Sequence, residues 1–132
     1  MFRFFYRAYR WFIFLPLIIV ITLFHGVLSI ILSFITVKKR ANYWGGQQWA
    51  KLVAKLTPVH PQLKGIEKVD PSSNYVIVPN HQSYYDVLLL YGWLPLDIRW
   101  MMKKELKYIP GIGFGSKAVG HIFIDRSSTS SA

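Results

Sequence analysis

The stretch that decides the fold is residues 11–35, WFIFLPLIIVITLFHGVLSIILSFI, in which no side chain carries a full charge. As an α-helix it would be about 37 Å long, which exceeds the roughly 30 Å hydrocarbon core of a bilayer. A buried helix of a soluble domain is shorter and has a polar face. A signal peptide is disfavoured too, because the run is too long and no small-residue cleavage pattern follows it. The sequence therefore predicts a helix that enters a membrane.

Basic residues flank this stretch on both sides, and they are Arg3, Arg7, Arg10, Lys38, Lys39 and Arg40. Because the two flanks are equally basic, the positive-inside rule does not give a direction of insertion. Two arrangements stay open. One is a single span. The other, which we favour, is a hairpin that bends near Pro16 or near His25 and Gly26 and returns both ends to the cytoplasmic side.

The composition of the whole chain points to a membrane surface. Its 132 residues suffice for one small domain, 52% are hydrophobic, 17% are aromatic, and the formal net charge is +10. A nucleic-acid-binding protein is usually basic and polar, whereas this chain is basic and apolar, so we expect a phospholipid membrane as partner and no nucleic acid. There is no cysteine. Disulfides, a thiolate nucleophile and a zinc–thiolate site are therefore excluded.

A second helix is predicted directly after the basic cluster. Apolar residues recur there at helical spacing, and they are Trp49, Leu52, Val53 and Leu56, with Pro58 ending the pattern. This amphipathic helix could lie in the membrane interface, or it could pack its apolar stripe on the soluble part, and the two can hold together. We therefore divide the chain into membrane-embedded or interfacial helices (1–57) and a soluble domain (58–132).

The soluble part alternates predicted strands and helices. After a linker rich in proline and serine, we expect strands at 75–78, 98–102 and 121–124, helices at 84–93 and 103–108, and a glycine loop at 111–115. This order is typical of an α/β sheet, in which ligands bind at the carboxyl ends of strands. The predicted fold class is thus α/β, preceded by a membrane-embedded helical segment, and His81 follows the first predicted strand.

Residues 80–86, Asn-His-Gln-Ser-Tyr-Tyr-Asp, carry the candidate chemistry. With His81 in a turn and Asp86 in the first helical turn, the carboxylate can accept a hydrogen bond from one ring nitrogen and leave the other free to take a proton. A hydroxyl deprotonated in this way can attack a thioester. The alternative is purely structural, because Ser83 and Asp86 also have the spacing of a helix capping box. Spacing alone leaves both interpretations open.

Two further blocks lie downstream, one formed by Lys103, Glu105 and Leu106 and the other by Ile122 to Arg126. Together with residues 80–86 they resemble the motifs of the glycerolipid acyltransferases, of which lysophosphatidic acid acyltransferase is the best-known member. The family's NHxSxxD motif is matched by Asn80, His81, Ser83 and Asp86, its KxEL block by Lys103, Glu105 and Leu106, and its IFIDR block by Ile122 to Arg126. The three blocks occur in the family's order over roughly residues 60 to 128.

The resemblance implies a role for each matching residue. His81 corresponds to the general base and Asp86 to its orienting partner, while Asn80 and Ser83 count with the binding residues. Arg126, helped by Lys103, corresponds to the group that holds the phosphate of the acceptor, which suits a guanidinium that binds phosphate through two hydrogen bonds. The alternatives for these two cations are a solvated charge and a plain ion pair.

The implied reaction transfers an acyl chain from acyl-coenzyme A or acyl carrier protein to a lysophospholipid, above all lysophosphatidic acid, giving phosphatidic acid. It needs no cofactor and no metal ion. The acceptor lies in the leaflet and the donor is cytosolic, so we expect membrane localisation with the active site facing the cytoplasm. Two alternatives remain: a membrane-anchored basic protein that binds anionic lipid or nucleic acid, and a small structural membrane protein.

The chain departs from the family pattern at its end. The family has a later PEGTR motif, which helps bind the phosphorylated acceptor, and no such motif occurs before Ala132. We therefore expect the sequence to be the N-terminal part of a longer enzyme, with an incomplete αβ domain and no activity of its own. Residues 111–118 lack the Gly-Lys-Ser/Thr of a phosphate-binding loop, and His25, His60 and His121 lack metal-ligand spacing.

Overall fold

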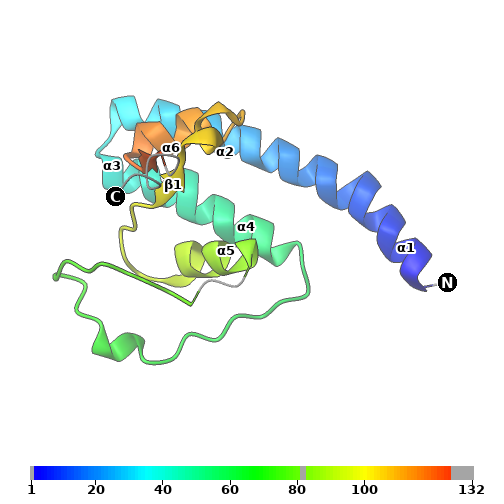
Figure 1. Cartoon of the computed structure of the whole chain (residues 1–132), viewed down its shortest axis with the longest axis horizontal. Coiled ribbons are helices and arrows are strands. Elements are labelled where there is room, and N and C mark those ends of the chain that lie inside the picture. The colour runs from blue at the N-terminus through cyan, green and yellow to red at the C-terminus, as the bar shows by residue number, and fades with distance from the viewer. Residues whose placement is uncertain (1, 81–82, 126–132) are drawn as a thin grey trace, which may run out of the picture.

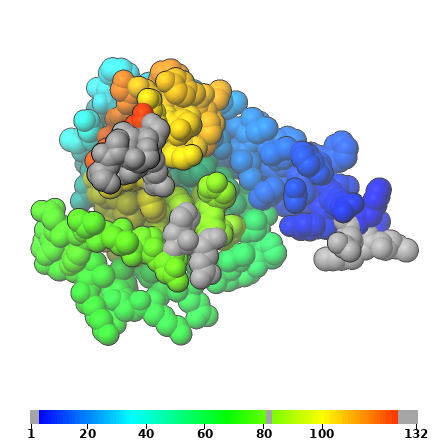
Figure 2. Space-filling view, viewed as in Figure 1, coloured from blue at the N-terminus to red at the C-terminus, as the bar shows by residue number. Residues whose placement is uncertain are grey.

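The computed structural model describes residues 2–80 and 83–125 of the chain. A long helix extends away from the rest of the molecule at its N-terminal end (Figures 1 and 2). It comprises α1 (Phe2–Tyr9), a π-helical turn (Arg10–Phe14) and α2 (Leu15–Ile35) without interruption. The other elements gather around its C-terminal half.

Pro16 does not bend this helix into a hairpin. Proline lacks an amide hydrogen, so it cannot donate to the carbonyl four residues earlier. The neighbouring π-helical turn accommodates it, since the Leu15 amide donates to the Arg10 carbonyl, five residues back. Our expectation of a bend near Pro16 or His25 was wrong. By length and composition, Phe4–Ile35 could cross a membrane, and 17% of its most apolar window is buried inside the molecule.

The chain reverses just after the apolar stretch. Thr36 and Val37 are both extended, with φ/ψ of −137°/176° and −69°/146°. Three short helical segments then run back along α2 (Figure 1), and they are α3 (Lys38–Ala41), a π-helical segment (Asn42–Gln47) and α4 (Gln48–Lys55). We call α2 together with residues 38–55 the N-terminal hairpin.

Helix α4 confirms the predicted second helix, although the covered face coincides with the predicted stripe only in part, at Val53. Ala50, Val53 and Ala54 are buried, whereas Leu52, a member of the predicted stripe, is 43% exposed. α4 packs against α5 and against α2. The two small alanines let the neighbouring helices approach closely, which accounts for their burial in preference to the larger leucine. The packing alternative for this helix is thus confirmed.

The segment from Leu56 to Asn80 is a long, mostly irregular excursion (Figure 1), with a 3₁₀ turn at Ile66–Lys68. The strand predicted at 75–78 was wrong. Val76 and Val78 are 93% and 87% exposed. Among the described residues no strand runs beside this segment. A strand needs a neighbour for its backbone hydrogen bonds, so β-branched residues alone do not produce one here.

The remaining elements follow the predicted order more closely. They are α5 (Tyr84–Trp93), β1 (Met101–Lys103), a 3₁₀ turn (Lys104–Tyr108), α6 (Gly113–Val119) and β2 (Ile122–Ile124). β1 and β2 are parallel, with Met101 opposite Ile122 and Lys103 opposite Ile124. A strand–helix–strand unit is thus present. The described chain as a whole is mostly helical, with one small parallel sheet.

Glycines bring α6 against α2 beside the small sheet (Figure 1). A Cβ on Gly26 would lie 2.2 Å from the Gly111 carbonyl oxygen, and one on Gly115 would lie 3.0 Å from the Gly26 Cα. Only glycine permits so close an approach of two backbones. The predicted loop at 111–115 was therefore wrong in part. Gly111 turns the chain at φ +79°, but α6 already begins at Gly113.

Candidate functional site

Asp86 lies in the first turn of α5, where a complete capping box holds it. Its Oδ2 accepts a hydrogen bond from the Ser83 amide at 2.7 Å, and the Ser83 hydroxyl accepts one from the Tyr85 amide at 3.2 Å. Ser83 is extended at the N-cap, as such a box requires. The structural alternative from the sequence is therefore confirmed. It fixes the Asp86 carboxylate at the start of the helix, next to the residues that precede it.

The predicted general base, His81, lies outside the described residues, together with Gln82. The structure therefore leaves the pairing of His81 with Asp86 as a prediction. Asn80 is exposed at the end of the irregular segment, and Ser83 is also exposed. The part of the candidate site that the structure describes thus consists of exposed Asn80 and Ser83 and the capped start of α5.

Lys103 and Lys104 have different surroundings. Lys104 donates to Asp125 Oδ2 at 2.8 Å, an exposed ion pair that raises the pKa of the lysine. Lys103 ends β1, opposite Ile124, and makes no ion pair with any described residue. Arg126 lies outside the described residues. The register nevertheless brings Lys103 beside the strand whose chain continues, two residues later, to Arg126.

No group of three or more acidic or histidine side chains in the described ranges is placed to hold a metal ion. The described residues therefore offer no metal centre beside the candidate site.

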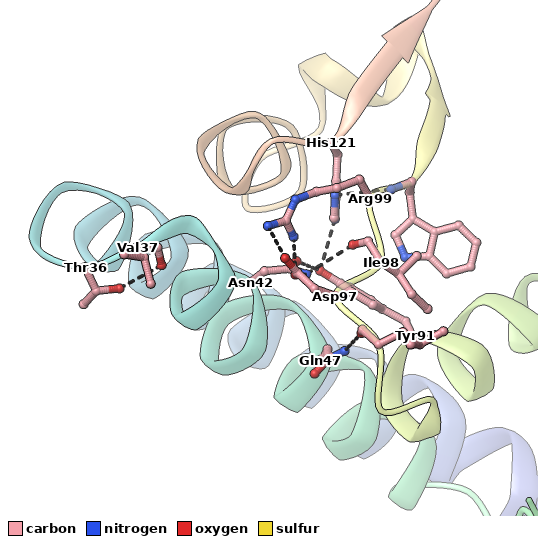
Figure 3. Close-up of polar contacts among 11 residues, drawn as sticks. Thr36, Val37, Asn42, Gln47, Tyr91, Asp97, Ile98, Arg99 and His121 are labelled. Carbon is pink, nitrogen blue, oxygen red and sulfur yellow. Dashed lines mark hydrogen bonds and ion pairs between the residues drawn. The ribbon is translucent and has the colours of Figure 1, made fainter. Parts of the chain in front are cut away.

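A second polar cluster, which the sequence did not predict, lies at the opposite end of α5 (Figure 3). Asn42, 0% exposed, accepts a hydrogen bond from the hydroxyl of Tyr91, which is 3% exposed. The same hydroxyl contacts His121 Nε2 at 3.1 Å, and the Trp100 amide donates to His121 Nδ1 at 3.4 Å. These bonds join the N-terminal hairpin, α5 and the segments before both strands.

The cluster ends in an ion pair. Asn42 Nδ2 donates to Asp97 Oδ1 at 2.7 Å and to the Ile98 carbonyl at 3.1 Å. Arg99 donates to both carboxylate oxygens of Asp97, at 2.6 and 2.7 Å. The paired carboxylate therefore accepts from the guanidinium and from the buried amide at the same time. Such a charge-assisted, two-point contact fixes Asp97 in one orientation.

Burial shifts the titration of both central groups. It is the main cause that lowers the pKa of His121 from 6.5 to about 4, and the positive charge of Arg99 acts in the same direction while Asp97 opposes it. Burial also raises the pKa of the Tyr91 hydroxyl above its ordinary value. At neutral pH both side chains are therefore uncharged, and each can act as hydrogen-bond donor and acceptor.

Comparison with known proteins assigns the family. Residues 60–132 match the family model described as "Acyltransferase". The chain belongs to the acyltransferase family. All three sequence blocks that resembled the glycerolipid acyltransferases lie within the matched residues, so the resemblance is confirmed.

The similar curated proteins share one description. The chain is 38% identical over 72 residues to the putative 1-acyl-sn-glycerol-3-phosphate acyltransferase acl-2 of Caenorhabditis elegans, covering 54% of this chain and 26% of that protein. It is 30% identical over 110 residues to the 1-acyl-sn-glycerol-3-phosphate acyltransferase of Saccharomyces cerevisiae, and the match covers 83% of this chain and 36% of that protein. The chain is also 45% identical over 51 residues to the 1-acyl-sn-glycerol-3-phosphate acyltransferase of Helicobacter pylori, and the match covers 39% of this chain and 22% of that protein.

The matched segments span between 22% and 36% of the length of these three acyltransferases. No solved structure matches the chain significantly.

Proposed function

We propose that this chain forms part of a membrane-bound enzyme that transfers an acyl group from acyl-coenzyme A or acyl carrier protein to lysophosphatidic acid, giving phosphatidic acid. The observation that carries the proposal is the similarity to acyltransferases whose names specify 1-acyl-sn-glycerol-3-phosphate, the chemical name of that acceptor. Membership of the acyltransferase family supports the reaction class.

In the proposed reaction His81 takes the proton of the acceptor hydroxyl. The alkoxide oxygen attacks the thioester carbonyl, the new C–O bond forms, the C–S bond breaks, and the imidazolium returns its proton to the departing thiolate. Asp86 orients the ring. Its capping hydrogen bond from the Ser83 amide supports this role, because a carboxylate fixed at the helix start cannot rotate away. The capping and catalytic interpretations of Asp86 are compatible.

Lys103 and Arg126 would hold the phosphate of the acceptor. The parallel register, with Lys103 opposite Ile124, supports their proximity. The ion pair between Lys104 and Asp125 distinguishes the two lysines, since Lys104 already has an acidic partner. This leaves Lys103 as the lysine that we assign to the acceptor.

Membrane seating follows from the physical state of the substrate. Lysophosphatidic acid resides in a leaflet, and the apolar surface of α1 and α2 is largely exposed. Residues 1–57 would hold the chain in the membrane, residues 58–132 would form the αβ part, and the site would face the cytoplasm, where the donor's carrier is soluble.

The test measures acyl transfer to lysophosphatidic acid in phospholipid vesicles. Because the relatives extend beyond the matched region, both residues 1–132 and a chimera that adds the C-terminal remainder of the yeast relative are assayed. In the active form, His81→Ala should lower kcat/KM by roughly a hundredfold or more. His60→Ala, an exposed histidine in the irregular segment, is the matched control.

The competing function is lipid or nucleic-acid binding without catalysis. It predicts vesicle or nucleic-acid binding that is unchanged by His81→Ala, and no acyl transfer by either form. Transfer that survives His81→Ala nearly intact would instead retain the reaction and remove His81 as its base.

A further inference from the structure

The buried cluster at the end of α5 forms a hydrogen-bond chain with one direction. The Tyr91 hydroxyl donates to Asn42 Oδ1, so its oxygen must accept from His121 Nε2. His121 Nε2 then carries the proton, and the unprotonated Nδ1 accepts from the Trp100 amide. The donors of these three bonds all face acceptors only when His121 is neutral and in this tautomer. A proton on Nδ1 would face the Trp100 amide, another donor.

The backbone of the π-helical segment leaves room for the Tyr91 side chain. Asn42 begins the π-helical segment of the hairpin, a kind of local irregularity that often occurs at functional positions. A Cβ on Gly46, in the same segment, would lie 1.8 Å from the Tyr91 hydroxyl oxygen. The hairpin thus approaches Tyr91 as closely as a glycine allows.

The chain of bonds joins the hairpin to each segment that carries a proposed site residue. Tyr91 lies on α5, which begins with the capped Asp86. Trp100 immediately precedes β1, which ends in Lys103, and His121 immediately precedes β2, which leads to Arg126. A shift of this cluster would therefore move all three segments relative to the hairpin, where the lipid acceptor would lie.

Stability alone is a poor reason for such a cluster. Buried polar groups are often no more stabilising than apolar packing of the same volume, but a fully paired network selects one arrangement. We infer that Asn42, Tyr91 and His121 are positioning residues, which hold α5, β1 and β2 in one arrangement relative to the N-terminal hairpin. This inference rests on the proposed function. It assigns these residues no contact with substrate.

The first experiment determines the protonation of His121. The chain is labelled with ¹⁵N-histidine in detergent micelles, and His121→Gln identifies the signal by its disappearance. The expected spectrum at pH 7 is that of a neutral ring with the proton on Nε2. A charged ring, or a proton on Nδ1, would contradict the direction of the chain and overturn the inference.

The second experiment measures the arrangement directly. Because the chain has no cysteine, spin labels can be placed at two exposed positions, Lys39 in the hairpin and Glu105 after β1, without other changes. One narrow distance distribution is expected. Tyr91→Phe and His121→Leu should broaden it, whereas His121→Gln, which keeps a donor and an acceptor, should retain the narrow form.

The control is Tyr108→Phe, which removes a hydroxyl from a tyrosine that is 76% exposed. Circular dichroism checks that every variant keeps its helix content. If Tyr91→Phe gives a distribution as narrow as Tyr108→Phe, the inference is wrong, because the cluster then does not hold the segments in place.

The third experiment links the arrangement to the reaction. In the active form, Tyr91→Phe should lower kcat by roughly tenfold, as expected for a small displacement of reacting groups, and Tyr108→Phe should leave it unchanged. An unaltered kcat in Tyr91→Phe would overturn the positioning role while leaving the proposed function intact. If neither residues 1–132 nor the chimera transfers an acyl group, the proposed function is refuted, and the distance measurements still decide whether the cluster orders the segments.

Discussion

The two ends of α5 are held by different kinds of interaction. At its start, Asp86 and Ser83 bond to backbone groups within three residues, and the turn is exposed. At its end, buried Tyr91 bonds to Asn42 and contacts His121, which are 49 and 30 residues away in the chain. The cap at the first end is local, and its Ser83 is exposed to solvent. The second is long-range, and its Asn42 and Tyr91 are buried.

The difference separates two tasks on one helix. An exposed capping box can present a carboxylate, but short-range bonds cannot fix the helix relative to the hairpin. The buried cluster fixes the end of the helix to the hairpin, within two helical turns of Asp86, and a separate hydrogen bond from the Tyr85 hydroxyl to the Ala54 carbonyl, at 2.9 Å, joins the first turn of α5 to α4. The chemistry and the placement of α5 should therefore fail separately when each end is altered, and the predictions below test this separation.

The largest effect is expected at the open end, from Asp86→Asn in the active form. The amide oxygen of asparagine can still accept from the Ser83 amide, so the cap and the fold should persist. The neutral side chain no longer stabilises a charged ring, so kcat/KM should fall by roughly a hundredfold or more. Kinetics and thermal unfolding are measured together. If kcat/KM and the thermal stability fall together, Asp86 acts only as part of the helix cap.

The closed end should respond to pH. The folded pKa of His121, about 4, is below the unfolded value of 6.5, so between these values only the unfolded chain binds the proton. Stability should be complete above about pH 6.5 and fall by roughly 3 kcal/mol toward pH 4. Denaturant titrations at several pH values measure this loss. The His121→Gln variant cannot titrate at this position, so its free energy of unfolding should fall less between pH 6.5 and pH 4. If wild type and variant have the same pH dependence of unfolding, His121 is not the group responsible.

A purely steric contact should have an intermediate effect. In Gly26→Ala the new methyl group would lie 2.2 Å from the Gly111 carbonyl oxygen, so α6 must shift away from α2. We expect a loss of about 2 kcal/mol of unfolding free energy. Val27→Ala, at the next and 55% exposed position, is the control. Equal stability of the two variants would show that α6 does not pack on α2 this closely.

The capping box should contribute less. Ser83→Ala removes the hydroxyl that accepts from the Tyr85 amide, which typically costs about 1 kcal/mol. Since Asp86 keeps its bond from the residue 83 amide, activity should fall far less than in Asp86→Asn. Unfolding and kcat/KM are again compared. A loss of activity as large as that of Asp86→Asn would give the Ser83 hydroxyl a role beyond the cap.

The same contrast explains what the sequence could predict. The bounds of α5 and its capping box follow from residues three apart, and the family motif is local too. Asp97 and His121 gave no signal, because each bonds to residues far away in the chain, and such partners have no characteristic spacing. For His121 the sequence indicated only that metal-ligand spacing is lacking. Asn42, which bonds to Asp97 and Tyr91, lies in a π-helical segment, which no periodic pattern indicates.

The strand expected at 75–78 failed for a related reason. Its run of tyrosine, valine and isoleucine indicates a preference for extended backbone. Whether a strand forms depends on a second strand beside it. β1 and β2 pair because α6, which connects them, returns the chain so that the two strands lie side by side. The irregular segment has no such neighbouring strand among the described residues. Whether two strands pair depends on the whole fold, so the local sequence of one segment does not predict it.

The smallest effect separates two adjacent lysines. Lys103→Gln should raise KM for lysophosphatidic acid by roughly fivefold, because an exposed charge contact contributes up to about 1 kcal/mol. Lys104→Gln should leave KM nearly unchanged, since that lysine already pairs with Asp125. Initial rates at varied acceptor concentration decide between them. If Lys104→Gln has the larger effect, the ion pair orders the β2 end of the site, and Lys103 is the solvated charge that the sequence also allowed.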